Sequence, residues 1–178
     1  QSVPPPPEGA AVKDVRSPVA ERPDLEVPRP VMVALLGSTI GNFTDAQNEE
    51  ILTNIRSLLH AGDRFLLGAD LRPSRGKSVE ELEAAYNDSR GVTAEFNRNI
   101  LANLNARLGT DFDPSRFGHR AFYDPGEARI EMHLVSRGAQ TVEVPERGRL
   151  HLEDGETIRT EISRKWDRES VRRLFALG

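Results

Sequence analysis

The sequence predicts an α/β fold, and three observations support that class. Residues 31–36 and 64–71 form two apolar runs, and each run stops abruptly at glycine or polar residues. Uninterrupted apolar runs of this length are typical of strands that are buried on both faces of a parallel sheet. Between them, residues 45–59 carry apolar side chains at helical spacing. Strand, helix and strand with short links form a βαβ unit, so we expect adjacent parallel strands with a right-handed crossover.

The loop after the first apolar run, with the sequence GSTIGNF, is the most informative stretch of the chain. Gly37 and Gly41 allow the backbone to approach a ligand closely or to adopt positive φ angles. Asn42 offers an amide donor and a carbonyl acceptor at the carboxyl end of the strand, where open α/β sheets bind ligands. The alternative is an ordinary connection from strand to helix, with Thr44 as the helix N-cap. Both interpretations stay open on the loop alone.

The second part of the chain has a different pattern. Helical patterns cover residues 79–86 and 92–108, and Gly109 is placed to end the second helix. Polar and apolar side chains then alternate, as in the strands of an antiparallel sheet, in four segments: residues 117–122, 129–136, 140–144 and 158–165. A last helix is expected over residues 168–177. At the other end, residues 1–30 are rich in proline, which favours irregular, extended backbone that builds little core.

Length and composition exclude several classes of protein for this chain. The 178 residues suit one domain, or one domain with a small insert. The net charge of -4 argues against a nucleic-acid-binding protein, and no apolar stretch approaches the length of a membrane span. The chain has no cysteine and no recognisable secretory signal, so we expect a cytoplasmic protein without disulfides or thiolate chemistry. The first residue is Gln1, which indicates processing, trimming or a fragment.

Four side chains in the second part could carry chemistry, and each has a structural alternative. Glu161 and Ser163 share one strand face, where they could accept and donate hydrogen bonds to a small polar ring or an amine. A solvated strand face is the alternative. Tyr86 at a helix end and Met132 on an apolar strand face are more typical of core packing. The four histidines lack the spacing of a metal site, so no metal is predicted.

Five motifs resemble, in the same order, those of the histidine-specific methyltransferases: LLGSTIGNF, LLGADL, AAYNDSRGVTAEFNRNILANLNARLGTDFD, FYDPGEARIEMHLVS and GETIRTEISRKW. In the ergothioneine pathway, this family methylates the α-amine of L-histidine with S-adenosylmethionine. The resemblance covers residues 31–178. It implies that residues 31–75 belong to a Rossmann-like S-adenosylmethionine methyltransferase sheet and that residues 166–178 form its return helix. An inserted α+β substrate-binding domain would occupy residues 76–165, and the proline-rich residues 1–30 precede both.

By matching positions, the resemblance also implies roles for individual residues. Gly37 would lie beside the cofactor, S-adenosylmethionine. Asn42 and Tyr86 would hold the amino-acid end of the substrate and are the predicted catalytic pair. These residue types fit the chemistry, because methyl transfer from a sulfonium is a direct displacement in which the protein mainly positions a neutral amine.

The other three matching residues would surround the imidazole ring of the substrate. The carboxylate of Glu161 can accept a hydrogen bond from one ring N–H, while Ser163 can serve the other ring nitrogen. Met132 would pack near the ring. A site of this kind rejects analogues that leave a buried polar group unpaired. The expected partner is a small-molecule amino-acid substrate, and we expect neither a nucleic acid nor a membrane as a partner.

The chain departs from the family pattern at the cofactor site. The family's cofactor-binding loop is rich in glycine and follows the first Rossmann strand, and neither is found in this sequence. The predicted sheet is therefore incomplete, which would leave apolar strand edges or faces uncovered. We expect a homodimer or binding to a complementary chain. Three functions stay open: a partial or complemented methyltransferase, an inactive descendant that binds an amino acid, and an interaction module that reuses the scaffold.

Overall fold

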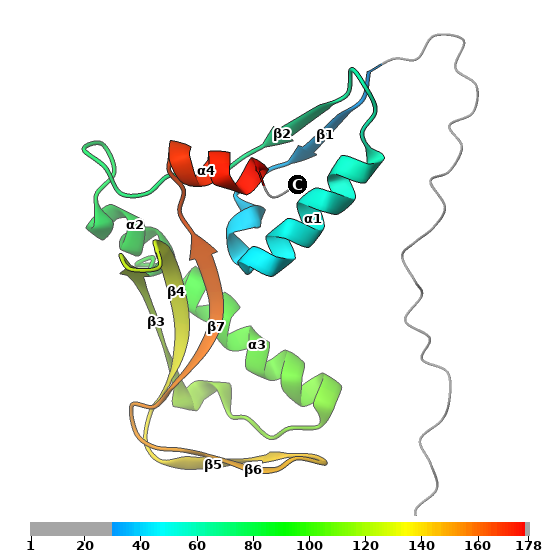
Figure 1. Cartoon of the computed structure of the whole chain (residues 1–178). Coiled ribbons are helices and arrows are strands. Elements are labelled where there is room, and N and C mark those ends of the chain that lie inside the picture. The colour runs from blue at the N-terminus through cyan, green and yellow to red at the C-terminus, as the bar shows by residue number, and fades with distance from the viewer. Residues whose placement is uncertain (1–29, 177–178) are drawn as a thin grey trace, which may run out of the picture.

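The computed structural model describes residues 30–176 of the chain, so the proline-rich segment predicted at the N-terminus lies outside the described residues apart from its last position. Within this range the structure is mixed α/β, with four α-helices and seven strands in three sheets (Figure 1). None of the described helices is both long enough and apolar enough to span a bilayer.

The first elements form the predicted βαβ unit. Strand β1 (Met32–Leu35) pairs in parallel with β2 (Arg64–Leu67), and the register places Met32 opposite Arg64. Helix α1 (Asp45–Leu58) connects the two strands. The prediction of adjacent parallel strands is therefore confirmed, although each strand is shorter than its apolar run.

The link between β1 and α1 contains a short 3-10 helix, η1 (Thr39–Asn42), followed by a helix cap. The hydroxyl of Thr44 accepts a hydrogen bond from the backbone N–H of Gln47 (3.3 Å). In return, the backbone N–H of Thr44 donates to Oε1 of Gln47 (2.9 Å). This reciprocal arrangement satisfies two backbone donors that a helix N-terminus leaves without partners. The prediction that Thr44 is the N-cap is confirmed.

The prediction that both parallel strands are buried on two faces is wrong for the described structure. Met32 of β1 is 62% exposed and Leu66 of β2 is 49% exposed, because alternate residues of both strands face away from the helices. The other face of the strands packs against α1 and α4 (Arg168–Phe175). The core of this part consists of Ile40, Leu52, Trp166 and Leu174.

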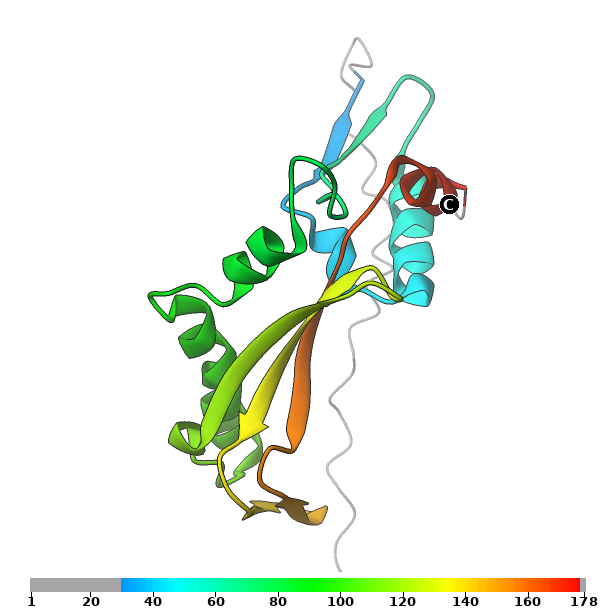
Figure 2. The ribbon, with the colours of Figure 1, turned by 90° about the vertical axis from the view of Figure 1, so that its left-hand side faces the viewer.

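Three of the four segments predicted as antiparallel strands form one sheet, and the fourth, residues 140–144, lies in a separate two-stranded sheet. In the three-stranded sheet, β3 (Phe117–Asp124), β4 (Arg129–Ser136) and β7 (Thr157–Arg164) lie in the order β3–β4–β7. Helices α2 (Val79–Tyr86) and α3 (Val92–Leu108) run along one face of this sheet (Figure 2). Both helices have the predicted bounds.

The far end of this sheet carries a β-hairpin (Figure 1). Gly109 ends α3 in the left-handed conformation (φ 69°), as predicted, and the chain continues through a short 3-10 helix, η2 (Pro114–Arg116), into β3. Strand β5 (Gln140–Val144) was predicted, but its partner β6 (Gly148–Leu152) was not. The hairpin closes a core made of Leu101, Phe112, Phe117, Leu134, Val142 and Leu152.

The end of β7 joins the two parts. A Cβ atom at Gly41 of η1 would lie 2.7 Å from the carbonyl oxygen of Arg164, so the two backbones are in direct contact. Gly41 thus permits an approach between two segments of the chain, rather than the approach to a ligand that the sequence suggested. Beyond β7, the N–H of Trp166 donates to the carbonyl of Asp70 (2.8 Å), and the N–H of Arg72 donates to the carbonyl of Trp166 (2.9 Å). The ends of β1, β2 and β7 therefore meet.

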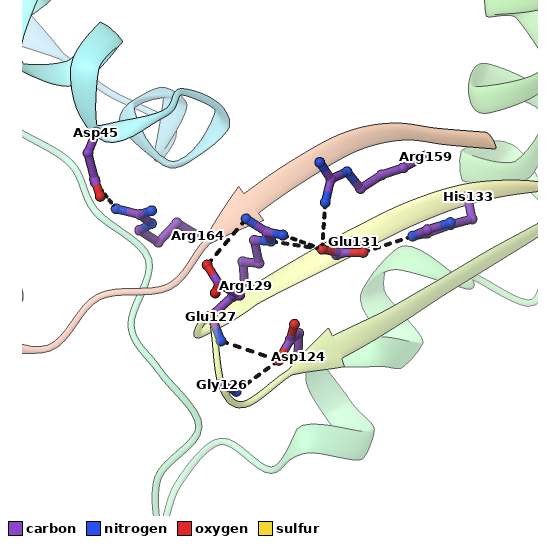
Figure 3. A network of polar contacts seen from close by, with 9 residues as sticks. All are labelled: Asp45, Asp124, Gly126, Glu127, Arg129, Glu131, His133, Arg159 and Arg164. Atoms are coloured by element: carbon purple, nitrogen blue, oxygen red, sulfur yellow. Dashed lines mark hydrogen bonds and ion pairs between the residues drawn. The ribbon is translucent and has the colours of Figure 1, made fainter. Parts of the chain in front are cut away.

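The face of the antiparallel sheet opposite the helices carries a network of charges centred on Glu131 (Figure 3). Glu131 is buried, and Oε1 accepts hydrogen bonds from Arg129 (2.5 Å) and Arg159 (3.0 Å). The ring Nε2 of His133 lies 2.9 Å from Oε2. Burial alone would raise the pKa of Glu131, but hydrogen bonds from these three neighbours outweigh it and lower this pKa to about 2. The network therefore ties β4 to β7 through an ionised carboxylate.

Candidate functional site

A cavity of about 550 Å³ lies where the carboxyl ends of β1 and β2 meet the ends of α2 and β7. This volume falls within the range of about 300–1,000 Å³ that is typical of small-molecule sites. Its lining is mainly polar and comes from distant segments of the chain: Gly37, Ser38, Asn42, Gly68, Ala69, Asp70, Tyr86, Glu161, Ser163 and Lys165. All the predicted site residues except Met132 are among them.

The turn after β1 forms one wall. Gly37 (φ 74°) and Ser38 (φ 60°) both adopt the left-handed conformation, which is unstrained for the glycine and uncommon for the serine. Ser38 is held there by β2, because its N–H donates to the carbonyl of Gly68 (3.1 Å) and its hydroxyl accepts from the N–H of Asp70 (2.9 Å). The positive φ expected for Gly37 is confirmed, while its place beside a cofactor stays a prediction.

Asn42 and Glu161 meet across the cavity although 119 positions separate them in the sequence. The Nδ2 of Asn42 donates to Oε1 of Glu161 (3.3 Å). Burial raises the pKa of Glu161 above its ordinary value, and Oε2 has no hydrogen-bond partner among residues 30–176. The carboxylate therefore has an acceptor free for a ligand.

Tyr86, Ser163 and Lys165 form a hydrogen-bonded triangle on the opposite side. The hydroxyl of Tyr86 donates to Oγ of Ser163 (3.1 Å). The ammonium group of Lys165 donates to the Tyr86 hydroxyl (2.7 Å) and to Ser163 Oγ (3.0 Å). Ser163 and Lys165 are buried and Tyr86 is partly buried, and all three line the cavity.

Asp70 balances the charge of Lys165. Its Oδ2 lies 3.0 Å from Nζ of Lys165, and its Oδ1 lies 2.5 Å from Nζ of Lys77. Burial alone would raise the pKa of Asp70, but hydrogen bonds from both lysines outweigh it and hold this pKa below its ordinary value. An ionised carboxylate between two ammonium groups therefore stands at the end of β2.

The backbone of the Tyr86 region is anchored to β3. The ring Nε2 of His119 lies 2.8 Å from the carbonyl oxygen of Tyr86. The side chain of Asn87 both donates to the carbonyl of Ala121 and accepts from its N–H, each at 2.9 Å. These contacts fix the end of α2, and with it the direction in which the Tyr86 side chain leaves the helix.

Met132 lies outside the cavity lining. It is 4% exposed and packs in a core cluster with Leu82, Ala121 and Ile130, against which Tyr86 rests. The core-packing alternative is thus the one observed in this structure. A contact between Met132 and a substrate ring stays a prediction.

Sequence reasoning missed three polar residues of the cavity, namely Ser38, Asp70 and Lys165. Lys165 had a usable signal, because residues 161, 163 and 165 have the same parity and lie on one face of an extended segment. It was overlooked because a lysine in an alternating segment usually faces solvent. Within residues 30–176, no group of three or more histidine, aspartate or glutamate side chains is arranged to hold a metal ion.

Comparison with known proteins identifies the family of this chain. A model of the histidine-specific, S-adenosylmethionine-dependent methyltransferases matches residues 11–177 of the chain. The chain belongs to this family.

Relatives within the family agree. The chain is 45% identical to the histidine N-alpha-methyltransferase of Mycolicibacterium smegmatis and 42% identical to that of Mycobacterium tuberculosis, in each case over 79% of this chain. It is 29% identical, over 63% of its length, to ergothioneine biosynthesis protein 1 of Schizosaccharomyces pombe. The alignments cover 43% of each bacterial relative and 14% of the yeast relative, so the chain spans less than half the length of these proteins.

Proposed function

We propose that this chain supplies the substrate side of a methyltransferase that transfers methyl groups from S-adenosylmethionine to the α-amine of L-histidine. The observation that carries the proposal is the meeting of Asn42, Tyr86, Glu161 and Ser163 in one cavity, in a chain of the histidine-specific methyltransferase family. Two relatives that are named histidine N-alpha-methyltransferase support the same reaction. Ergothioneine biosynthesis is the proposed context, and the cytoplasm is the proposed location.

The polar groups of the cavity suit the two ends of a histidine molecule. Glu161 offers an acceptor to a ring N–H, and Ser163 offers a hydroxyl to the other ring nitrogen. Asn42 and Tyr86 carry the donors and acceptors that would orient the amine and carboxylate. Orientation is the main requirement, because a displacement at a methyl group needs the attacking amine to be held in line with the bond that breaks.

The methyl donor fits one side of the cavity. S-adenosylmethionine would supply a methyl group on a positively charged sulfonium. At the carboxyl end of β1, Gly37 presents backbone without a Cβ atom to the cavity. The carboxylate of Glu161 lines the same space and, when ionised, favours a positive charge there, whereas Asp70 is already paired with Lys77 and Lys165. Gly37 is therefore the residue proposed to lie beside the donor.

The fold is proposed to be a Rossmann-like sheet, incomplete in this chain, with an inserted substrate domain. The parallel pair β1–β2 supports the first part, and the antiparallel sheet with α2 and α3 supports the second. We propose that residues 31–75 and 166–178 belong to the Rossmann-like domain and residues 76–165 to the substrate domain. The return of the chain to β2 through Trp166 supports these boundaries.

The proposed function is tested by titration calorimetry of the chain with L-histidine and with S-adenosylmethionine. We expect histidine to bind to the chain, because the residues proposed to hold it are all present. Binding of S-adenosylmethionine in the same preparation would support a chain that also holds the methyl donor, whereas binding of histidine alone would support a substrate side that needs a complementary chain, or an amino-acid-binding module. Failure of both ligands to bind would overturn the proposed function altogether.

Substitutions in the cavity should weaken histidine binding unequally. Glu161→Ala should cost about 1–3 kcal/mol of binding free energy, because it removes a charged hydrogen-bond partner. Ser163→Ala should cost less, about 0.5–1.5 kcal/mol, because the lost hydrogen bond is between neutral groups. Calorimetry measures both, with Glu143→Ala on the exposed hairpin as the control that should bind like the unmodified chain. Equal affinities for Glu161→Ala and the control would remove Glu161 from the site.

The uncovered face of the β1–β2 pair should promote association with a second copy or with a complementary chain. Met32 and Leu66 are large apolar side chains exposed on this face, and such patches are typical of contact surfaces. In sedimentation equilibrium we expect a mass above 19.8 kDa that rises with concentration. The double substitution of Met32 and Leu66 by lysine should lower this mass, whereas Val92→Lys on exposed α3 should not. A stable monomer at high concentration would contradict self-association.

A further inference from the structure

Lys165 is a buried cation in the lining of the cavity, and the proposed function assigns no role to it. Lys165 is the residue directly after β7, and its side chain is 1% exposed. Lysine is buried this deeply only when its charge is paired, and Asp70 provides the carboxylate. The Nζ atom also lies 4.9 Å from the centroid of the Tyr86 ring, at the hydroxyl end of that ring.

Three acceptors surround the ammonium group of Lys165. They are the hydroxyl of Tyr86 (2.7 Å), Oγ of Ser163 (3.0 Å) and Oδ2 of Asp70 (3.0 Å). An ammonium group has three hydrogens to donate and no lone pair to accept with. The three contacts therefore use all its hydrogens, and both hydroxyl oxygens must act as acceptors toward Lys165.

The remaining hydrogen bond of the triangle joins the two hydroxyl groups. The Tyr86 hydroxyl donates to Ser163 Oγ (3.1 Å), so Ser163 accepts from two donors, Tyr86 and Lys165. A serine hydroxyl has two lone pairs and one hydrogen. With both lone pairs in use, Ser163 can only donate toward a ligand in the cavity.

Unlike Ser163, Glu161 accepts a hydrogen bond from a ligand. Its Oε1 already accepts from Asn42, and its other oxygen is available to accept from a ligand. A ring held between Glu161 and Ser163 must therefore present one N–H and one nitrogen with a free lone pair. Neutral imidazole has both. An imidazolium ring has two N–H groups, so one of them would face the hydroxyl hydrogen of Ser163.

We propose that Lys165 is a positioning residue that makes the cavity select the neutral form of an imidazole ring, by fixing Ser163 as a hydrogen-bond donor. The inference rests on the proposed function, because it presumes that histidine occupies this cavity. The charged or titratable groups that face Lys165 are Asp70 at the end of β2, Tyr86 on α2 and Glu161 on β7. Lys77 lies behind Asp70 and does not reach the triangle.

The test is the pH dependence of histidine affinity, measured by titration calorimetry at pH 7.5 and 5.5. An imidazole with its ordinary pKa near 6.5 is mostly neutral at the first pH and mostly charged at the second. We expect the unmodified chain to bind histidine about tenfold more weakly at pH 5.5. Lys165→Met removes the three donors, so Ser163 becomes free to accept. This variant should bind more weakly at pH 7.5 and lose less than about threefold between the two pH values.

Lys77→Met is the matched control, because it also removes a cation from Asp70 but leaves the triangle intact. It should keep the tenfold change of the unmodified chain. Glu161 titrates in all three proteins, so the difference between their profiles isolates Lys165. If Lys165→Met does not fold, the unmodified chain still decides, because equal affinity at the two pH values would overturn the proposal. A steep profile retained in Lys165→Met would overturn it too, and the proposed function would stand. No histidine binding by the unmodified chain at either pH would overturn both.

Discussion

Replacing Gly41 with alanine is expected to lower the free energy of unfolding by about 3 kcal/mol, the upper end of the usual range for overpacking. The new Cβ atom would lie 2.7 Å from the carbonyl oxygen and 3.1 Å from the amide nitrogen of Arg164. Both obstacles are backbone atoms of β7, which cannot move aside as the tip of a flexible side chain can. The chain must therefore separate η1 from β7, and urea denaturation measures the cost.

The same substitution should also weaken histidine binding, because Asn42 follows Gly41 directly and contacts Glu161 of β7. Gly76→Ala is the matched control, since nothing lies within 4 Å of a Cβ atom there and its φ angle is not in the left-handed region. Equal stability of the two variants would show that η1 and β7 do not pack as closely as described.

Replacing Glu131 with glutamine should lower the free energy of unfolding at pH 7 by about 1.5–3 kcal/mol, the range for hydrogen bonds to a charged group. Glutamine keeps the shape of the side chain but removes the charge that Arg129, Arg159 and His133 surround. Glu143→Gln is the control, because that residue also pairs with an arginine, Arg149, but both side chains are more than half exposed. An exposed pair contributes at most about 1 kcal/mol.

The effect of Glu131→Gln should depend on pH in a defined direction. The pKa of Glu131 is about 2 in the folded protein, below the ordinary value of 4.5 for the free side chain. A lowered pKa stabilises the fold fully above the unfolded value, and this contribution is lost as pH falls toward the folded value. The difference in unfolding free energy between the unmodified chain and the variant should therefore shrink between pH 4.5 and pH 2. A difference that stays constant over this window would contradict the network.

Local signals in the sequence predicted most of the elements, because caps and periodicity act over a few residues. Thr44 begins α1 and Gly109 ends α3, each through contacts with its immediate neighbours. The prediction that both strands are buried on two faces failed, because a run of apolar residues records which contacts a strand can make and not which of them the fold supplies. Met32 and Leu66 are apolar by sequence and exposed in the structure.

The site shows the same limit at a finer scale. Strand parity placed Glu161 and Ser163 on one face, and the family resemblance pointed to Asn42 and Tyr86. The hydrogen bonds among them depend on how β7 returns past η1 and α2, which no local pattern records. Lys165 illustrates this, because its partner Asp70 lies 95 positions earlier, at the end of a different strand.

The placement of the aromatic residues gives the two halves of the molecule separate optical reporters. The chain has a single tryptophan, Trp166, which is buried in the core between α1, α4 and the parallel strands. Its two tyrosines, Tyr86 and Tyr123, both pack against the core cluster that contains Leu82 of α2 and Met132 of β4. Selective excitation of tryptophan thus follows the parallel-strand half during unfolding, while tyrosine emission follows the antiparallel half, in one unlabelled protein. Because Tyr86 also lines the cavity, we expect the tyrosine signal to change if a ligand binds there.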